Sequence, residues 1–175
     1  MMKAYEAGLY FGDGVAHRNK KNRSYGVWID QHIKNTDILE NLKNRLAKKE
    51  VNFCCYKVPD NKIRVLFYSK EEFLKLKNVK ENPVQFFNEL SDREKKEFIS
   101  GFFDAEGTIT DRLVIYNQNK ILLEEISKFL GTLGIVSYIY KFNRVFGLQI
   151  YRRNHVQIFR KNIKSVKLSR VIQVR

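Results

Sequence analysis

Two acidic residues, Asp13 and Glu106, occupy the same place in two similar segments of the 175-residue chain. Residues 4–14 and 97–107 align without a gap at an offset of 93 positions, and a glycine follows each acid. A carboxylate in the last turn of a helix faces the negative end of the helix dipole, which is unfavourable by about 0.3–1 kcal/mol. Two carboxylates brought together beside helix-end carbonyls would form a hard, oxygen-rich site suited to Mg²⁺. Such a site can activate water and stabilise a leaving oxygen, which suits phosphodiester chemistry.

Small residues recur four positions apart in both segments and would let two helices touch. Gly8 and Gly12 share a face of the first predicted helix, and Gly101 and Ala105 match them in the second. Small side chains at this spacing allow helix backbones to approach closely. A glycine inside a helix costs about 0.5–1 kcal/mol relative to alanine, so each needs a compensating contact. We therefore expect the two helices to pack side by side in parallel, which would bring the two acids together.

A simpler interpretation of each acid–glycine pair is an ordinary helix end, because Asp-Gly and Glu-Gly are common in turns. Gly14 and Gly107 are predicted to take the left-handed conformation that often ends a helix. The repetition of the same pair in two matched segments favours a joint site over two unrelated turns.

The elements that must position these segments repeat in the same order. The pattern after each segment predicts two strands' worth of chain, in which one strand is located, then a helix, a hairpin and a closing helix. In the first half these lie at residues 25–29, 36–46, 53–58 with 63–68, and 70–77; in the second they lie at 113–116, 121–133, 138–142 with 145–151, and 153–163. The predicted fold class is α+β, a single domain over residues 1–175 with half-repeats at 1–80 and 93–175 and a connector at 81–92.

The charge of the chain favours a polyanionic partner. It holds 33 basic and 19 acidic side chains, a formal net charge of +14, and both halves are basic. The bases crowd one early loop at Arg18, Lys20, Lys21 and Arg23. A solvated cationic face that serves solubility is the alternative. An anionic membrane surface fits less well, because it calls for one basic amphipathic helix and these bases fall in loops and strands.

Side chains on the predicted hairpins suit the reading of a DNA groove. Strand alternation turns one face outward, where Arg and Lys can read guanine and Gln can read adenine. The candidates are Lys62 and Arg64 on one strand, Lys141 and Arg144 around the second hairpin turn, and Gln149 and Tyr151 on its return strand. Exposed polar side chains without a ligand are the alternative interpretation of any one of them.

Several other classes of protein are disfavoured. Cys54 and Cys55 are adjacent and supply no disulfide framework, and three scattered histidines give no zinc cluster. No apolar run approaches the roughly 18 residues that span a bilayer, and no signal-peptide pattern is present. We therefore expect a soluble intracellular protein, cytoplasmic and nucleoid-associated in a prokaryote, with an organellar location left open.

Both segments resemble the helix motif that names the LAGLIDADG homing endonucleases. The second reads FISGFFDAEG at residues 98–107, and the first reads AGLYFGDG at residues 7–14. The repeated order of elements extends the resemblance over nearly the whole chain, as in compact single-chain members encoded in introns, archaeal ones among them. The resemblance implies a pseudo-two-fold αββαββα fold, with the motif helices between the halves and two antiparallel four-stranded sheets forming a saddle on DNA.

The same resemblance implies a site and an activity. Asp13 and Glu106 would be the metal-binding catalytic acids, with the carbonyls of Gly12 and Ala105 as further ligands. Polar residues from the strand after each motif would surround the metal, here Gln31 and Asn117 (or Gln118). The implied activity is cleavage of both strands of double-stranded DNA at a long asymmetric site by a monomer that uses Mg²⁺ or another divalent cation such as Mn²⁺. No counterpart of the basic residue that the family places near the metals is identified.

Two other functions fit the same scaffold. One is an RNA maturase that helps its host intron to splice, with intron RNA as partner. The other is a DNA-binding regulator that kept the fold and lost the chemistry. Retention of both Asp13 and Glu106 speaks against the regulator.

Overall fold

The computed structural model describes residues 4–170. The predicted domain and half-repeats also include residues 1–3 and 171–175, which lie outside the described residues. The first half comprises α1 (Ala4–Asp13), β1 (Gly14–Asn19), β2 (Ser24–His32), the 3-10 helix η1 (Ile33–Asn35), α2 (Thr36–Ala47), β3 (Phe53–Val58), β4 (Lys62–Tyr68) and α3 (Lys70–Glu81). The second comprises α4 (Pro83–Glu89), α5 (Asp92–Glu106), β5 (Gly107–Ile109), β6 (Leu113–Asn117), α6 (Lys120–Thr132), β7 (Tyr138–Phe142), β8 (Val145–Ile150), α7 (Arg153–Asn162) and α8 (Val166–Arg170).

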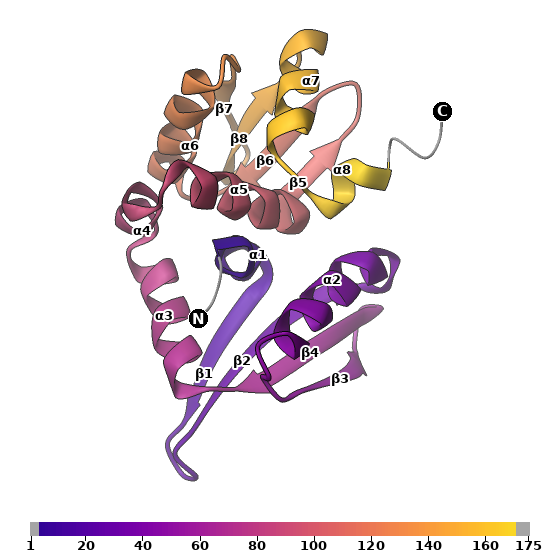
Figure 1. Ribbon diagram of the computed structural model, residues 1–175, viewed down its shortest axis with the longest axis vertical. Helices are drawn as coiled ribbons and strands as arrows, with labels where there is room; N and C mark the ends of the chain where they lie inside the picture. Colours follow the sequence, from indigo (N-terminus) through magenta and orange to yellow (C-terminus); the bar gives the residue numbers. More distant parts are fainter. Residues whose placement is uncertain (1–3, 171–175) are drawn as a thin grey trace.

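The two halves have the same sheet topology, which confirms the predicted fold class. The first sheet has the strand order β1-β2-β4-β3 and the second β5-β6-β8-β7, and every pairing is antiparallel. Even the register repeats, because Gly14 pairs with Ile29 and Gly107 pairs with Ile115. The sheets lie on opposite sides of the paired helices α1 and α5 (Figure 1).

The contact between α1 and α5 is as close as the small residues predict. A Cβ atom on Gly8 would lie 2.0 Å from the carbonyl oxygen of Phe98, and one on Gly101 would lie 1.9 Å from that of Tyr5. Gly12 lies against α5 one turn further on. These contacts advance in the same direction along both helices, so α1 and α5 are parallel. Gly8 and Gly101 are needed because backbone atoms lie where a side chain would be, whereas Gly12 faces the side chains of Ala105 and Glu106.

Each half has its own hydrophobic core, and the motif helices connect the two. Tyr5 and Leu9 of α1 pack in the first-half cluster, beneath the sheet and α2. Ala4 and Ala7 of the same helix pack in the second-half cluster with Phe98 and its neighbours. Helix α1 is therefore held by both cores at once.

The glycines that follow the motif acids correct one prediction. Gly107 has an extended backbone (φ −76°, ψ 142°), and Gly134 is the glycine with positive φ among residues 4–170. Gly14 and Gly107 are instead needed for space. A Cβ on Gly14 would lie 2.0 Å from the Tyr10 ring, and one on Gly107 would lie 2.3 Å from the carbonyl oxygen of Phe103. The strand folds back so tightly on the helix that any side chain would collide with the preceding turn.

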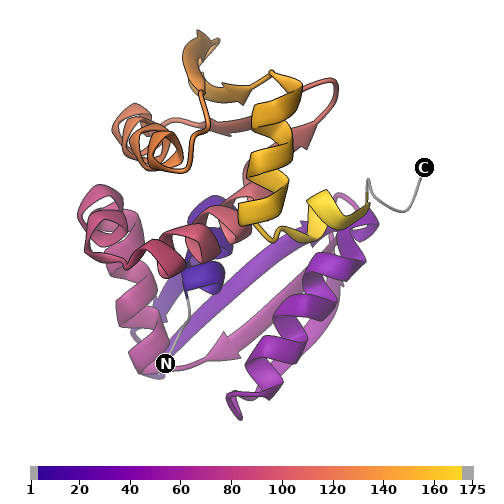
Figure 2. The ribbon, with the colours of Figure 1, turned by 45° about the horizontal axis from the view of Figure 1, so that its top comes forward.

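The connector and the end of the chain contain helices that periodicity did not predict. The segment 81–92 holds α4, which begins at Pro83 and buries Phe87. A capping box of Ser91 and Glu94 then opens α5, as the sequence predicts. After α7, the five-residue helix α8 lies beside α2 of the other half (Figure 2).

Candidate active site and nucleic-acid interface

The two motif acids lie next to each other at the ends of α1 and α5. A Cβ atom on Gly12 would lie 3.0 Å from Cγ of Glu106 and 3.4 Å from its Oε1. The negative charge of Asp13 is close enough to act on the carboxyl of Glu106. The structure therefore brings together two residues that are 93 positions apart, as the parallel packing of glycine-bearing helices requires.

Burial shifts the pKa of both motif acids upward. Burial raises the pKa of Asp13, and nearby Lys167, the Gln31 amide, Lys62 and Lys80 oppose the rise. Burial also raises the pKa of Glu106, and the charge of Asp13 adds to that effect. A bound cation would offset the cost of ionising these two carboxyls in a desolvated place.

Gln31 holds one of these acids directly. Its side chain is buried, and its Nε2 donates to Oδ2 of Asp13. Its Oε1 accepts a hydrogen bond of 2.9 Å from Nδ2 of Asn35. The period-two geometry of β2 directs Gln31 to the same side as the buried Ile29, which is why it reaches the helix end.

Asn117 is the positional counterpart of Gln31, but it has a different contact. Each lies two residues beyond the strand partner of the motif's final glycine. Oδ1 of Asn117 accepts the backbone N–H of Asn119 at 2.9 Å and so shapes the turn into α6. Asn117 and Gln118 nevertheless line a cavity of about 340 Å³ together with Glu106 and Lys80. The predicted catalytic roles of Gln31 and Asn117 stay predictions.

Two lysines that the sequence analysis did not select lie at the site. Lys80 from α3 donates to the carbonyl oxygen of Gly14, and Lys167 from α8 donates to those of Ala105 at 3.1 Å and Gly107 at 2.9 Å. Burial lowers the pKa of both lysines, and the charges of the two motif acids oppose that change. Each half thus contributes one ammonium group. No signal in the sequence distinguishes these two lysines, because the chain holds 33 basic residues.

The donor atoms at the helix ends fit a hard divalent cation. Two carboxylates and adjoining backbone carbonyls offer oxygen only, and Mg²⁺ prefers one or two carboxylates with water and phosphate oxygens completing its shell. Within residues 4–170 no group of three or more His, Cys, Asp or Glu side chains could hold a metal, so Asp13 and Glu106 are the acidic ligands on offer. The Ala105 carbonyl, a predicted ligand, already accepts from Lys167.

The outward face of the first sheet carries part of the predicted DNA-binding set. Lys62 and Arg64 lie on this face of β4, where Arg64, Trp28 and Tyr56 line a hollow of about 140 Å³. Arg64 is also held by Asp30 through two hydrogen bonds of 2.7 Å, and its guanidinium lies 4.8 Å from the centre of the Trp28 ring. A base contact by Arg64 would therefore have to compete with an existing ion pair.

The basic residues of the early loop do not share one location. Arg18 lies in β1, where it pairs with Tyr25 and stacks on its ring at 5.4 Å, on the helix side of the sheet. Lys20, Lys21 and Arg23 are exposed in the hairpin turn, and Arg23 has a positive φ of 55°. The hairpin turn thus carries three exposed bases beyond the sheet, and the fourth, Arg18, is exposed on the helix side of the sheet.

The second sheet presents an aromatic face instead of a basic one. Gln149 and Tyr138 are paired across β8 and β7, and the Tyr138 ring lies 5.6 Å from that of Tyr151. Further along this face the hydroxyl groups of Tyr116 and Tyr140 lie 3.1 Å apart. The two remaining bases predicted to bind DNA lie elsewhere: exposed Arg144 is in the hairpin turn, and Lys141 pairs with the core-packed Phe146.

No helix within residues 4–170 is both long and apolar enough to cross a bilayer.

Comparisons with known proteins agree with this geometry. The profile of the LAGLIDADG-like domain matches residues 93–164. The chain is 33% identical over 150 residues to the homing endonuclease I-DmoI of Desulfurococcus mucosus, covering 79% of this chain and 74% of that protein. It is 29% identical over 142 residues to an uncharacterized protein of Methanocaldococcus jannaschii, covering 78% of this chain and 50% of the relative, so it spans half the length of that protein.

A solved structure shows the same architecture. The crystal structure of I-DmoI in complex with DNA and Ca superposes with a TM-score of 0.77 at 26% identity, covering 97% of this chain and 96% of that one. The fold of two motif helices and two four-stranded sheets is thus shared with a relative that is one-third identical in sequence. The chain belongs to the LAGLIDADG homing endonuclease family, as a single-chain member that carries both motifs.

Proposed function

We propose that this protein is a site-specific DNA endonuclease that makes a metal-dependent double-strand break at a long asymmetric site. The observation that carries the proposal is the meeting of Asp13 and Glu106 at the ends of two parallel helices, with Lys80 and Lys167 beside them. The two ammonium groups would offset the negative charge that the two carboxylates and a polyanionic substrate bring to this half-buried site.

The residues of the chain have distinct tasks in this proposal. The carboxylates of Asp13 and Glu106, with the carbonyl of Gly12, would hold Mg²⁺ or Mn²⁺ against the scissile phosphates. The bound cation would activate water and stabilise the leaving oxygen. Gln31 keeps the Asp13 carboxylate in one orientation through its hydrogen bond. Lys80 and Lys167 would stabilise the negative charge that develops on the phosphate, because their ammonium groups are already desolvated and fixed.

The outward sheet faces would bind the two halves of the DNA site. The first offers Lys62, Arg64 and Trp28, and the second offers tyrosines with Gln149. Basic side chains suit guanine edges and phosphates, whereas aromatic and amide groups suit thymine methyls and adenine edges. A chain with two unlike faces needs no second copy, and it is expected to act as a monomer on an asymmetric sequence. The structure of I-DmoI with DNA and Ca supports the choice of substrate class.

The test is a cleavage selection on random DNA. A pool of long duplexes is first enriched for binding in Ca²⁺, and the retained pool is then incubated with Mg²⁺, with Mn²⁺, or with EDTA. We expect cleaved ends at one sequence family in Mg²⁺ and Mn²⁺ and none in EDTA. Enrichment of a bound sequence without cleavage in either metal would contradict the endonuclease and favour a DNA-binding regulator.

A further inference from the structure

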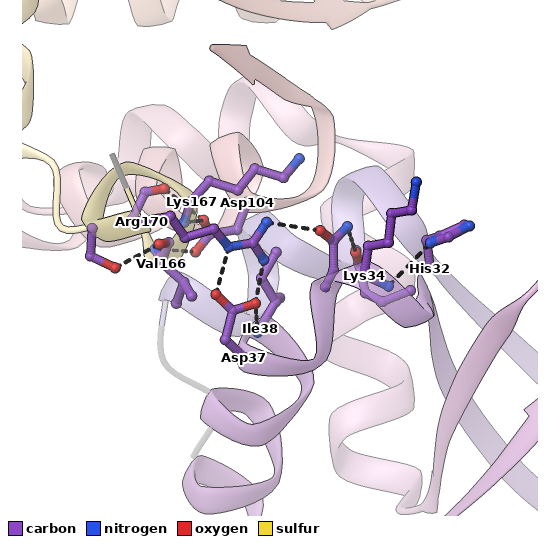
Figure 3. A network of polar contacts seen from close by, with 12 residues as sticks. His32, Lys34, Asp37, Ile38, Asp104, Val166, Lys167 and Arg170 are labelled. Carbon is purple, nitrogen blue, oxygen red and sulfur yellow. Dashed lines mark hydrogen bonds and ion pairs between the residues drawn. The ribbon is translucent and has the colours of Figure 1, made fainter. Parts of the chain in front are cut away.

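Helix α8 belongs to the second half of the sequence but contacts the first half. Figure 3 shows Arg170, at its end, directed toward the start of α2. Nε of Arg170 donates to Oδ2 of Asp37 at 2.6 Å, and its Nη2 also bonds to that carboxylate. Nη1 donates to Oδ1 of Asn35 at 3.1 Å. One guanidinium therefore holds two side chains of the other half at once.

From Asn35 a line of hydrogen bonds continues to the active site. Nδ2 of Asn35 donates to Oε1 of Gln31 at 2.9 Å, and Nε2 of Gln31 donates to Oδ2 of Asp13. A guanidinium can only donate, and an ionised carboxylate can only accept. With Arg170 at one end and Asp13 at the other, both amides between them can satisfy every bond in one orientation only. Reversal of either amide would place two donors or two acceptors face to face.

The starting point of this line is itself fixed by the second motif helix. Asp104 of α5 is fully buried and accepts the backbone N–H groups of Val166 at 3.0 Å and Lys167 at 2.8 Å, and the hydroxyl of Ser165 at 2.6 Å. It also accepts the hydroxyl of Tyr5, from α1, at 2.8 Å. Since α8 is attached to α5 at its first turn, Arg170 reaches a defined position over the other half.

No equivalent line reaches the second acid within the described residues. The counterpart of Gln31 is Asn117, whose Oδ1 accepts from the backbone of Asn119. The orientation of Glu106 therefore rests on packing and on the neighbouring charges of Lys80 and Lys167. The difference indicates that the line from Arg170 serves Asp13 in particular.

We propose that Arg170 is a positioning residue for the metal-binding acid Asp13 and acts through Asn35 and Gln31. This inference rests on the proposed function, because it assumes that Asp13 holds a divalent cation. By spanning the two halves, the line makes the orientation of the first-half acid depend on correct docking of the second half. Loss of a partner one step removed from a metal ligand typically costs 10–100-fold in metal affinity or activity. Arg170 is further removed, so we expect about a tenfold effect.

The first experiment needs neither DNA nor cleavage. In ¹⁵N-labelled protein, the side-chain NH₂ signals of Gln31 and Asn35 report whether each amide is held. We expect Arg170→Ala to accelerate exchange of the Gln31 NH₂ protons with water, and Arg170→Lys to do the same because one ammonium cannot hold both acceptors. Ser169→Ala, on the exposed neighbour, is the control and should leave the signals unchanged. Unchanged Gln31 exchange in Arg170→Ala would overturn the inference.

The second experiment measures the consequence for the metal. Mn²⁺ affinity is followed by electron paramagnetic resonance of free Mn²⁺, and cleavage of the selected duplex is followed as a function of Mg²⁺. Arg170→Ala should weaken both about tenfold while DNA affinity in EDTA and the melting temperature stay near those of Ser169→Ala. Asn35→Ala should have the same effect, and the double variant should be no worse than either single one, because both interrupt one line. Additive losses would contradict a shared route.

The two hypotheses fail in different ways. If the unaltered protein cleaves no DNA, the proposed function fails, and the NMR comparison still decides whether Arg170 orients Gln31. If the protein cleaves DNA and Arg170→Ala matches Ser169→Ala in both Mn²⁺ affinity and Mg²⁺ dependence, the positioning role of Arg170 is wrong and the proposed function stands.

Discussion

The two halves of the molecule share a backbone plan but secure their motif helices differently. Position 104 in the second helix corresponds to position 11 in the first. Asp104 is a buried carboxylate that caps α8 and bonds to Tyr5 across the helix pair. Phe11 instead packs against Phe98 and Phe102, with ring centres 6.4 and 5.3 Å away. At these matched positions the second motif helix is held by a polar network, and the first is held by aromatic packing.

The difference extends to the acids and to the sheets. Asp13 is held by the amide of Gln31, whereas Glu106 has no such partner in the described residues. The first sheet faces outward with bases and Trp28, and the second with tyrosines. The two halves thus share the small residues that the contact between α1 and α5 requires. Their outward sheet faces differ, because each face has different surroundings. Variants at matched positions of the two halves measure how unequal the halves are.

The largest effect is expected at the paired acids. Asp13→Asn and Glu106→Gln should each reduce double-strand cleavage by about three orders of magnitude or more, because each removes a charged metal ligand worth several kcal/mol in the transition state. Both variants should bind DNA in EDTA at least as tightly as the parent protein, measured by fluorescence anisotropy. Full nicking activity in both single variants would refute their assigned roles, and nicking in only one would show that the halves work unequally.

The next effect should be the same in both halves. Gly8→Ala and Gly101→Ala each place a methyl group about 2 Å from a backbone carbonyl oxygen of the facing helix. Backbone in a packed helix cannot move aside cheaply, so we expect a loss of about 3 kcal/mol in the free energy of unfolding. Gly131→Ala in α6 is the control, since nothing lies within 4 Å of its added Cβ, and it should stabilise by about 0.5–1 kcal/mol. Urea unfolding that finds one motif glycine tolerant would break the two-fold equivalence of the interface.

A smaller and unequal effect is expected where the halves differ. Asp104→Asn keeps the volume but directs an NH₂ group at donors, so it should cost about 2 kcal/mol, the scale of hydrogen bonds to a charged group. Phe11→Leu, at the matching position, should cost about 1 kcal/mol because it only alters apolar packing. Thermal unfolding of the two variants gives the ranking, and equal losses would show that the buried network adds nothing beyond packing.

The smallest effect concerns pH. Burial raises the pKa of Asp13 and of Glu106, so the folded protein holds these protons more tightly than the unfolded chain does. Their contribution to stability is therefore most favourable below the ordinary carboxyl pKa of about 4 and is lost as pH rises through the raised folded values. In EDTA, Asp13→Asn and Glu106→Gln should gain stability over the parent as pH increases from about 4 to 7. A gain that does not change with pH would contradict the burial of these charges.

Much of the fold followed from short-range patterns. The glycine spacing predicted the helix pair, and periodicity predicted helices α2 and α6 and both hairpins near their observed bounds. Two strands' worth of chain were expected after each motif, but β1 was not located because Arg18 was assigned to the basic loop, and α4 was missed because it is short and has few periodic apolar positions. The left-handed glycines were predicted from helix-end statistics, whereas Gly14 and Gly107 are required by a steric collision with the preceding turn.

The residues of the candidate site also divide into those that the sequence predicted and those that only the structure revealed. Asp13 and Glu106 could be found because an unfavourable acid at a helix end, repeated at a fixed offset, leaves a mark in the sequence. Lys80, Lys167 and Arg170 leave none, since a lysine or arginine in a chain of net charge +14 is unremarkable wherever it falls. Only the packing of α3 and α8 against the helix ends gives these three cations a role.

The sequence by itself indicated that the two acid-bearing helices pack together, because small residues at four-residue spacing allow close approach and a helical glycine otherwise costs about 0.5–1 kcal/mol. It also determined two similar halves and a cationic surface. The tertiary structure alone decided which cations surround the acids, which amide orients Asp13, and that a helix of the second half reaches into the first. Those contacts join residues 18 to 135 positions apart, and their energies depend on three-dimensional docking that no local pattern records.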